Sequence, residues 1–360
     1  MANSSYQAIT KPKLYISYPL YQYATGALDD VLSNFNLPQE DILRMIQLDP
    51  SKITRLTPSE VNAFNVIRYR IVPQSDDFTP VIDNGLWNFD YCAVLGHNLA
   101  SAGIVLEPQA GSDLGEGNHQ PLEVSNIANF NPQGVPEYDG WSLFNLDSKP
   151  TNEHRRFRFG FKAQDGLGTQ TESPVLIGSI MFGKSYTFPQ NTDLTQTITT
   201  DYGVKQKQTI SGKTISTANW TKVNNWITEP FGYTEPFGER GDNFQRRSGR
   251  RTWKISFDSL APEKVMNQLM MMNSNNWNAQ DNHSIAADGT SSLYNINNAV
   301  DFYTNVVHRT LGGHLPMLLQ TNADDPSPQN FAIVRMKPNY TITQKTPNLY
   351  NISLTLIEQI

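Results

Sequence analysis

The sequence predicts a mainly β protein whose middle part folds as a β-sandwich, and three observations carry this prediction. Residues 91–95 and 103–106 are apolar runs separated by turn residues, as in two strands joined by a tight corner. Residues 155–161 alternate basic and aromatic side chains, which is typical of a strand with one exposed and one buried face. Residues 175–183 form a continuous apolar run, which indicates a strand buried on both faces. We expect the last two segments to pack on the first.

The composition allows two domains and argues against nucleic acid as a partner. The chain has 360 residues, and single hydrophobic cores stop growing near about 250 to 300 residues. Only 17% of the residues are charged, against about 25% in an average globular protein, so we expect neighbouring subunits to cover part of the surface. The net charge of −6 argues against a specific nucleic-acid-binding function, because such binding needs a basic face.

Targeting and redox signals favour a soluble protein made inside a cell. Cys92 is the single cysteine, so no internal disulfide can form and a cytosolic place of folding is favoured. The first five residues lack the basic and apolar regions of a signal peptide. No apolar run approaches the ~18 residues of a membrane span, so we expect none.

Residues 1–80 read as an arm more than as a domain. A short strand over residues 14–18 precedes a helix that begins at Pro38, a residue suited to the first helical position. A capping-box pattern at residues 57–60 indicates a second helix. Its apolar side chains share one helical face and are Val61, Phe64 and Ile67. Because the arm carries little apolar surface, it must pack against other parts of the assembly.

Residues 81–190 contain the sandwich, which we expect to fold as an independent module. A Gly-, Pro- and Asn-rich stretch from 108 to 147 interrupts it and holds one aromatic segment at residues 138–146. Residues 191–215 then alternate polar and apolar side chains around turn residues 201–203. We interpret them as a long polar hairpin, a structure that is stable only when another sheet covers it.

The remaining residues predict a loop and then a mixed, mainly antiparallel barrel with two helices on one side. Residues 216–249 are loop-like and carry spaced aromatic side chains. The expected helices are 262–272 and 300–311, and the expected strands are 251–257, 315–320, 331–336, 340–344 and 350–358.

The order of these motifs resembles two known viral domains. The segments AVLGHNLASAGIVL, RRFRFGF and PVLIGSIMFGKSY resemble the discoidin-like (galactose-binding-like) jelly roll in tail-associated structural proteins of tailed bacteriophages. The segments RRTWKISFDSL, HRTLGGHLPMLLQ and NLYNISLTLIEQ resemble the barrel domain of phage distal-tail proteins. The resemblance implies a discoidin-like β-sandwich at 81–190 and a distal-tail-like β-barrel with two flanking helices at 191–360, which follow the N-terminal arm with short helices at 1–80. It also implies a homo-oligomeric ring, with a hexamer favoured and a trimer as the alternative.

The residues that usually carry catalysis or bind metals do not form a recognisable pattern. None of the six histidines belongs to an H-x-x-x-H or His/Cys pair, and His308 and His314 stand six residues apart across a helix end. The segment around Ser179 lacks the second glycine of a nucleophile elbow. Carboxylate pairs such as Asp113 and Glu116 lie in expected loops. We therefore expect no cofactor, no metal and no enzymatic activity.

A sugar site on the jelly roll is a second hypothesis, because ligands of discoidin-like sandwiches generally bind at loops on one end. Its candidate residues are Trp87, Trp141, Arg155 and Arg156. His97 and Asn98 at the strand corner have two interpretations. In one, Gly96 permits the turn and Asn98 caps it; in the other, both residues line a sugar-binding edge. We favour the structural interpretation.

Aromatic and arginine side chains in the second half predict a subunit interface. Aromatic residues within Asn-, Pro- and Gly-rich sequence are typical interface anchors, and guanidinium groups suit ion pairs between subunits. The candidate interface residues are Trp220, Trp226, Phe231, Arg240, Arg246, Arg247 and Arg250. Arg251 extends the arginine cluster by one residue.

Together these observations favour a structural virion protein of a tailed bacteriophage, a distal-tail or baseplate-hub component that forms a ring in the tail. Its expected partners are further copies of itself and other tail proteins (tail tube, hub and fibres), with assembly in the host cytoplasm. The alternative is a carbohydrate-binding tail adhesin that recognises a host surface glycan. A glycan hydrolase is the third hypothesis, and no residue pattern supports it.

Overall fold

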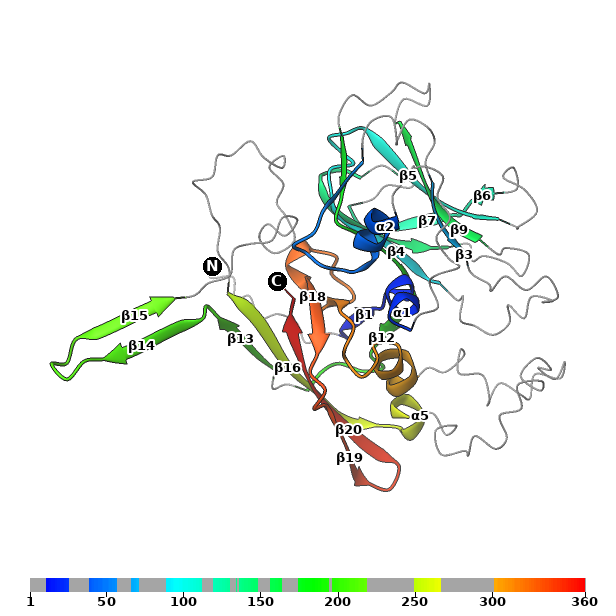
Figure 1. Cartoon of the computed structure of the whole chain (residues 1–360). Helices are drawn as coiled ribbons and strands as arrows, with labels where there is room; N and C mark the ends of the chain where they lie inside the picture. The colour runs from blue at the N-terminus through cyan, green and yellow to red at the C-terminus, as the bar shows by residue number, and fades with distance from the viewer. Residues whose placement is uncertain are drawn as a thin grey trace, which may run out of the picture.

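The structure is a computed structural model, and it describes most of the chain in separate ranges. The described residues are 11–25, 39–56, 66–70, 89–111, 119–129, 134, 136–147, 156–163, 174–193, 196–218, 249–266 and 301–359. Within these ranges the protein is mainly β, which confirms the predicted class. The strands form an eight-stranded sheet, two four-stranded sheets and two two-stranded sheets (Figure 1).

Two four-stranded sheets lie face to face. The middle sheet has the order β11-β4-β8-β7 and consists of β4 (Tyr91–His97), β7 (Val124–Ala128), β8 (Gly140–Leu146) and β11 (Ser179–Gly183). The outer sheet has the order β3-β9-β5-β6 and consists of β3 (Val66–Arg70), β5 (Ile104–Gly111), β6 (His119–Pro121) and β9 (Arg156–Ala163). A short sheet beside them pairs β2 (Thr54–Leu56) with β10 (Val175–Ile177).

The three segments that predict the sandwich occupy these sheets. The run 91–95 lies in β4, which pairs antiparallel with β11, while the alternating segment lies in β9 of the opposite sheet. Phe157 and Phe159 of β9 are both fully buried, as the two-residue period of a strand requires. The run 175–183 is divided at Gly178 into β10 and β11, which pair with different strands.

The middle sheet is buried on both faces. Cys92 and Val94 of β4 belong to a core shared with the outer sheet. Their neighbours Tyr91, Ala93 and Leu95 belong to a second core shared with the eight-stranded sheet. Because one face of the middle sheet is completed by strands from elsewhere in the chain, residues 81–190 do not hold a self-contained core. We therefore revise the expectation that they fold as an independent module.

The large sheet has the order β12-β1-β17-β18-β20-β16-β13, and β19 also pairs with β20. Its strands come from both ends of the chain: β1 (Lys13–Tyr15), β12 (Ser185–Thr187), β13 (Thr197–Asp201), β16 (Arg250–Leu260), β17 (Met317–Gln320), β18 (Phe331–Met336), β19 (Thr341–Thr346) and β20 (Leu349–Glu358). The five strands predicted after residue 250 are thus present. The two outermost strands of the large sheet, β12 and β13, do not pair with each other. The described strands therefore form an open sheet and not the expected barrel.

The N-terminal arm is built into the body of the protein. β1 is inserted between β12 and β17 of the large sheet, while β2 and β3 pair with β10 and β9. A side chain at Gly183 would collide with the carbonyl oxygen of Ile16, so the arm crosses the middle sheet at a point where only glycine fits. The arm therefore finds the covering surface that its low apolar content demands.

Helices cover the junctions between sheets. They are α1 (Tyr18–Ala24), α2 (Gln39–Ile46), α5 (Pro262–Val265), a π-helix (Tyr303–His308) and a 3₁₀ turn (Pro328–Asn330). Three expected helices are represented: α2 follows Pro38, α5 follows Ala261, and the π-helix leads to Gly312 and Gly313, which both have positive φ. Residues 267–272, expected as the rest of the helix that contains α5, lie outside the described ranges.

Three local predictions are wrong. Ile67 lies in strand β3 and not on a helix, while residues 57–60 lie outside the described ranges. The stretch 108–147 does not only interrupt the sandwich, because its described residues include β6 and β7, which are strands of the two four-stranded sheets. The polar hairpin lies one strand later than expected, because β13 pairs with β16 and the hairpin is formed by β14 (Val204–Gln208) and β15 (Thr214–Ala218).

Candidate assembly surface

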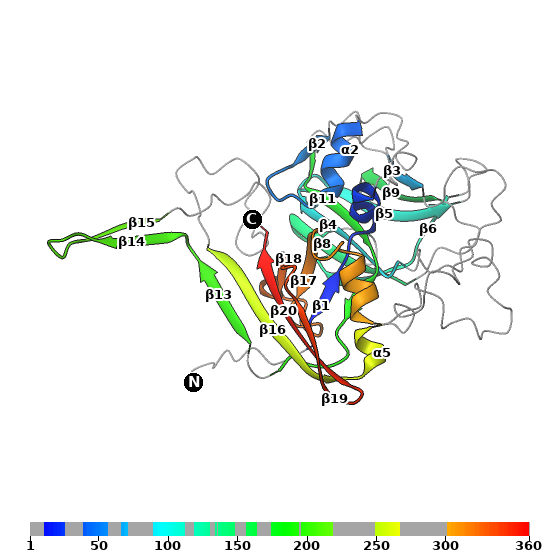
Figure 2. The same ribbon diagram turned by 60° about the horizontal axis from the view of Figure 1, so that its bottom comes forward.

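The hairpin β14–β15, which we call the arm hairpin (residues 204–218), stands apart from the cores. Among the described strands, β14 and β15 pair only with each other. Every residue of β14 is exposed, and so are residues 211–217. In both views the hairpin extends away from the three larger sheets (Figures 1 and 2). A two-stranded hairpin with no covering surface is at best marginally stable in water, so this element is suited to contact with another molecule.

The turn of the arm hairpin is well defined although its surroundings are open. The Thr209 N–H donates to the Lys213 carbonyl at 2.8 Å, and the Lys213 N–H donates to the Thr209 hydroxyl at 3.0 Å. Gly212 has a φ of 80°, a conformation that other residues rarely adopt. Ile210, at the tip, is fully exposed, and Val204 and Ile215 are half exposed. The hairpin thus presents apolar side chains on a locally fixed backbone.

The arm hairpin is basic within an acidic protein. It carries Lys205, Lys207 and Lys213 and contains no aspartate or glutamate. The whole chain has a net charge of −6, so the chain without these three lysines has a net charge of −9. The sequence shows this segregation of charge directly, although the interface prediction did not use it. The hairpin is therefore electrostatically complementary to an acidic protein surface such as that of another copy.

Strand β13 adds an open edge to the same side of the molecule. It pairs with β16 along one side only within the described part of the chain. All five of its residues are exposed, and Ile198 and the adjacent Tyr202 each expose 47% of their surface. An edge strand with free N–H and C=O groups is a template for pairing with another chain.

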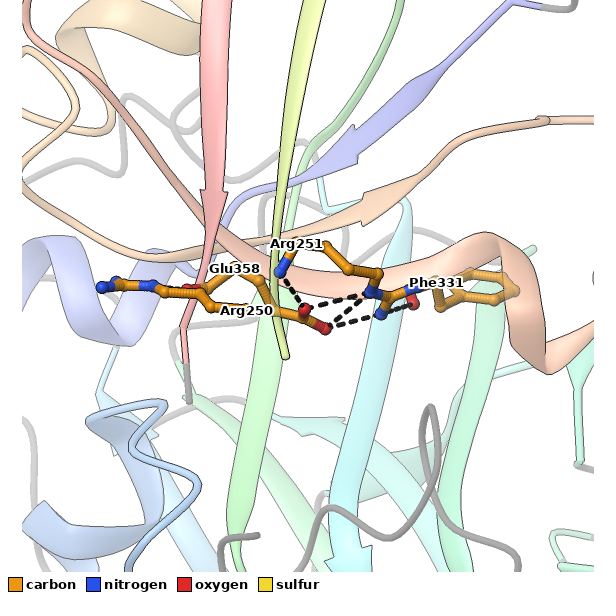
Figure 3. A network of polar contacts seen from close by, with 4 residues as sticks. All are labelled: Arg250, Arg251, Phe331 and Glu358. Atoms are coloured by element: carbon orange, nitrogen blue, oxygen red, sulfur yellow. Dashed lines mark hydrogen bonds and ion pairs between the residues drawn. The ribbon is translucent and has the colours of Figure 1, made fainter. Parts of the chain in front are cut away.

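Arg251 is held in an ion pair within the protein. Its Nη2 donates to Glu358 Oε1 at 2.6 Å, and its Nε lies 3.0 Å from both Glu358 oxygens (Figure 3). Its backbone N–H also donates to Glu358 Oε2 at 2.9 Å. The guanidinium carbon lies 4.9 Å from the ring centre of Trp253. This half-buried ion pair joins β16 to the end of β20 and so has a structural role.

Arg250 is the one predicted interface residue within the described ranges. It is exposed, and its Nε donates to the Glu358 carbonyl at 2.6 Å (Figure 3). Its position at the start of β16, beside β13, places it on the side of the large sheet that carries the open edge. The other predicted interface residues lie outside the described ranges and are Trp220, Trp226, Phe231, Arg240, Arg246 and Arg247.

Trp141 is a core residue, which contradicts its prediction as a sugar-binding side chain. It is 1% exposed and belongs to the core between the middle and large sheets. Its ring centre lies 4.7 Å from that of Phe331 in β18. Arg156 begins β9, opposite Arg70 of β3. Trp87 and Arg155 lie outside the described ranges, so the structure does not bring the four candidate residues together.

His97 and Asn98 have the structural role that the sequence favours. Gly96 has a φ of 65° and makes the corner. The Asn98 side chain then accepts a hydrogen bond from Leu176 N at 2.7 Å and donates one to the Pro174 carbonyl at 3.0 Å. The side chain of His97 is fully buried.

A chain of hydrogen bonds fixes the tautomer of His97. Leu99 N donates to Nδ1 at 3.3 Å, so Nε2 carries the proton and donates to Ser142 Oγ at 2.8 Å. Ser142 Oγ in turn donates to the Asn129 carbonyl at 2.9 Å. Burial lowers the pKa of His97 to about 3, so its ring is neutral at physiological pH. No substrate-facing surface remains on this side chain.

The part of the chain that the structure describes contains neither a group of metal-binding side chains nor a membrane-spanning helix. No three His, Cys, Asp or Glu side chains there are grouped to hold a metal ion. None of the helices in the described ranges has the length and hydrophobicity to cross a bilayer. Comparisons of the chain with protein-family models, curated proteins and solved structures give no match. The resemblance to phage tail proteins therefore rests on the sequence motifs.

Proposed function

We propose that this chain is a structural virion protein of a tailed bacteriophage, a distal-tail or baseplate-hub component that forms a ring in the tail. The observation that carries the proposal is the arm hairpin, a basic, exposed, two-stranded element with the exposed apolar side chain of Ile210 at its tip. The motifs that resemble tail proteins supply the biological setting. The chain assembles in the host cytoplasm and remains in the virion, in contact with tail tube, hub or fibre proteins.

The arm hairpin needs a neighbour for physical reasons. Its two strands pair only with each other among the described strands, and burying Ile210 against another subunit stabilises it by removing apolar surface from water. Its three lysines are attracted to the remainder of another copy, which carries a net charge of −9. A head-to-tail contact of this kind closes into a ring when the rotation between subunits divides a full turn. A hexamer is favoured by the resemblance, and a trimer is the alternative.

The test is the mass of the purified protein and of extracted tail complexes, compared between the parent chain and a hairpin variant. In the variant, Lys205, Lys207 and Lys213 are replaced by glutamate. We expect a ring-sized mass for the parent chain and a monomer for the variant, with unchanged thermal stability because the hairpin contributes no side chain to either core.

A matched control reverses three exposed lysines elsewhere: Lys11, Lys254 and Lys337. It carries the same charge change, so it should assemble like the parent chain if the position of the charge matters. A parent chain that is monomeric in both preparations would contradict the ring. Assembly that survives in the hairpin variant would contradict the hairpin as its contact.

A further inference from the structure

A cleft of about 390 Å³ lies between the N-terminal arm and the end of the large sheet. This volume is within the range of small-ligand sites, about 300 to 1,000 Å³. Leu20, Leu48 and Leu315 line it and are nearly fully buried, so part of its wall is apolar. Tyr23 and His314 also line it and are exposed, so they lie toward solvent. The cleft thus has an apolar wall and an open polar rim.

Arg335 of β18 is the cation in the lining of the cleft. Its Nη1 donates to the His314 carbonyl at 2.7 Å, which fixes one end of the guanidinium group. Its Nε is buried and has no hydrogen-bond partner in the described structure. In a guanidinium group, Nε and Nη2 point their hydrogens along the same edge, the geometry that matches the two oxygens of a carboxylate.

The same edge of another arginine in this protein is fully used. Arg251 presents Nε and Nη2 to Glu358, with distances of 3.0 and 2.6 Å to Oε1. Arg335 forms no ion pair with a described residue. The carboxylate nearest in the lining, that of Asp49, accepts hydrogen bonds from Ser51 and forms an ion pair with Lys52 at 3.3 Å.

The electrostatic surroundings leave the charge of Arg335 incompletely compensated. Burial and then the positive charge of Arg250 lower the pKa of Arg335, while the negative charge of Asp49 raises it. A partly buried cation with an unpaired donor atom is stabilised when an anion binds to it. The cleft lining therefore contains a cation with an unpaired donor atom, a carboxylate that is already paired with Lys52, and a partly apolar wall.

We propose that this cleft binds a carboxylate carried on a short apolar stem, with the Nε–Nη2 edge of Arg335 as its anchor. The stem packs on Leu20, Leu48 and Leu315. The carboxylate belongs either to a free small molecule or to the acidic side chain of an assembly partner, and the two sources share the same chemistry. The proposal uses no residue of the arm hairpin and does not depend on the ring.

The first experiment titrates the purified full chain with succinamate and, separately, with succinamide. The two compounds have the same stem and differ in that succinamate has one carboxylate. The readouts are calorimetry and the ¹H–¹⁵N resonance of the Arg335 Nε–H. We expect succinamate to bind with a dissociation constant on the order of 1 mM and to shift this resonance, while succinamide does neither. Equal binding of the two compounds, or no binding of succinamate, overturns the proposal.

Variants locate the site. Arg335→Gln should weaken succinamate binding at least tenfold, and Arg335→Lys, which keeps the charge without the two-pronged edge, should weaken it several-fold. Lys254→Gln removes one positive charge from an exposed position on β16 and should leave binding unchanged. If Arg335→Gln does not fold, the lysine variant and the resonance shift in the parent chain still decide. Parent-like binding by a folded Arg335 variant overturns the assignment.

A second experiment separates the two sources of the carboxylate. Tail complexes formed by the parent chain and by Arg335→Gln are compared by mass, with and without succinamate. Weaker assembly of the variant, together with competition by succinamate, identifies a partner's side chain. Unchanged assembly identifies a free ligand. Because probe binding is measured in any oligomeric state, failure of the ring and failure of the cleft are distinguishable.

Discussion

Acid should destabilise this protein through His97. The ring is fully buried at the corner of β4, with Nδ1 accepting from Leu99 N and Nε2 donating to Ser142 Oγ. A second proton would have to sit on Nδ1, where it would face the N–H of Leu99. The folded protein therefore disfavours the charged ring in two ways, by desolvation and by the loss of an acceptor. Desolvation alone lowers the pKa to about 3.

The direction and size of the effect follow from linkage. The unfolded chain binds a proton on this histidine near its ordinary pKa of about 6.5, and the folded chain does so only near pH 3. The contribution of the neutral His97 ring to the free energy of unfolding is therefore fully present above about pH 6.5. It is lost as the pH falls through the window from about 6.5 to 3. The loss amounts to about 2 kcal/mol at pH 5 and approaches about 5 kcal/mol at the lower end. A typical domain has about 5 to 15 kcal/mol in total.

The assay is the free energy of unfolding in denaturant at pH 7.5 and at pH 5, for the parent chain and for His97→Gln. Glutamine supplies an amide N–H toward Ser142 Oγ and does not titrate, so the variant isolates the contribution of the ring from those of the carboxylates. We expect the parent chain to lose about 2 kcal/mol more than the variant on acidification. Equal losses, or a ring that titrates above pH 5 by NMR in the folded protein, would refute the reasoning.

Three further substitutions or deletions test the packing. Trp141→Ala should destabilise the fold by about 3 to 5 kcal/mol, measured by thermal melting, because it removes a buried ring that contacts Phe331; a surface sugar-binding residue would leave the melt unchanged. Phe159→Asp should unfold the sandwich, because a charge without a partner costs several kcal/mol in that core, and parent-like melting would show that this face is not core. Deletion from Asn351 onward removes most of β20, which pairs with β16, β18 and β19, and should yield insoluble protein; normal soluble yield would contradict that assignment.

The strands could be predicted where their pattern is set locally. Residues 331–336 form β18 with the predicted bounds, and 350–358 differs from β20 by one residue, because each segment is apolar at the spacing of a buried strand. The continuous burial of β4 was also visible in its uninterrupted apolar sequence. These properties depend on residues within the strand and need no knowledge of what lies across from it.

Pairing between distant segments could not be predicted in the same way. Turn residues 201–203 suggested that the strands before and after them pair, and Gly203 does adopt a positive φ. The chain instead leaves the sheet there: Ile198 lies opposite Trp253 of β16, and the next turn, at Gly212, closes the hairpin. The sequence has adequate turn residues in both places, so the competition is decided by the packing of β16, which lies some 50 residues further along the chain.

Trp141 was misassigned for a related reason. An aromatic residue in a Gly- and Asn-rich stretch has the sequence context of an exposed, ligand-binding side chain. In the structure, however, β8 lies between two other layers of strands. Its partner Phe331 comes from β18, far along the chain. A strand covered on both faces buries its odd- and its even-numbered side chains alike. The layer that covers the second face comes from distant parts of the chain, which no local pattern encodes.

The two arginines Arg251 and Arg335 differ in whether the fold gives the guanidinium group a carboxylate partner, and this difference identifies the candidate site. The sequence placed the first in a cluster suited to an interface and gave no reason to notice the second. Folding brings Glu358 to the Nε–Nη2 edge of Arg251, and this ion pair neutralises the charge of Arg251 within the protein. The same fold leaves the Nε of Arg335 without a hydrogen-bond partner and forms no ion pair between Arg335 and a described carboxylate. Because an unsatisfied, partly desolvated guanidinium group raises the free energy of the folded chain, a carboxylate that reaches Arg335 gains stabilisation that Arg251 can no longer offer. Between two residues of identical chemistry, the one without an internal partner is therefore the better candidate for a binding site.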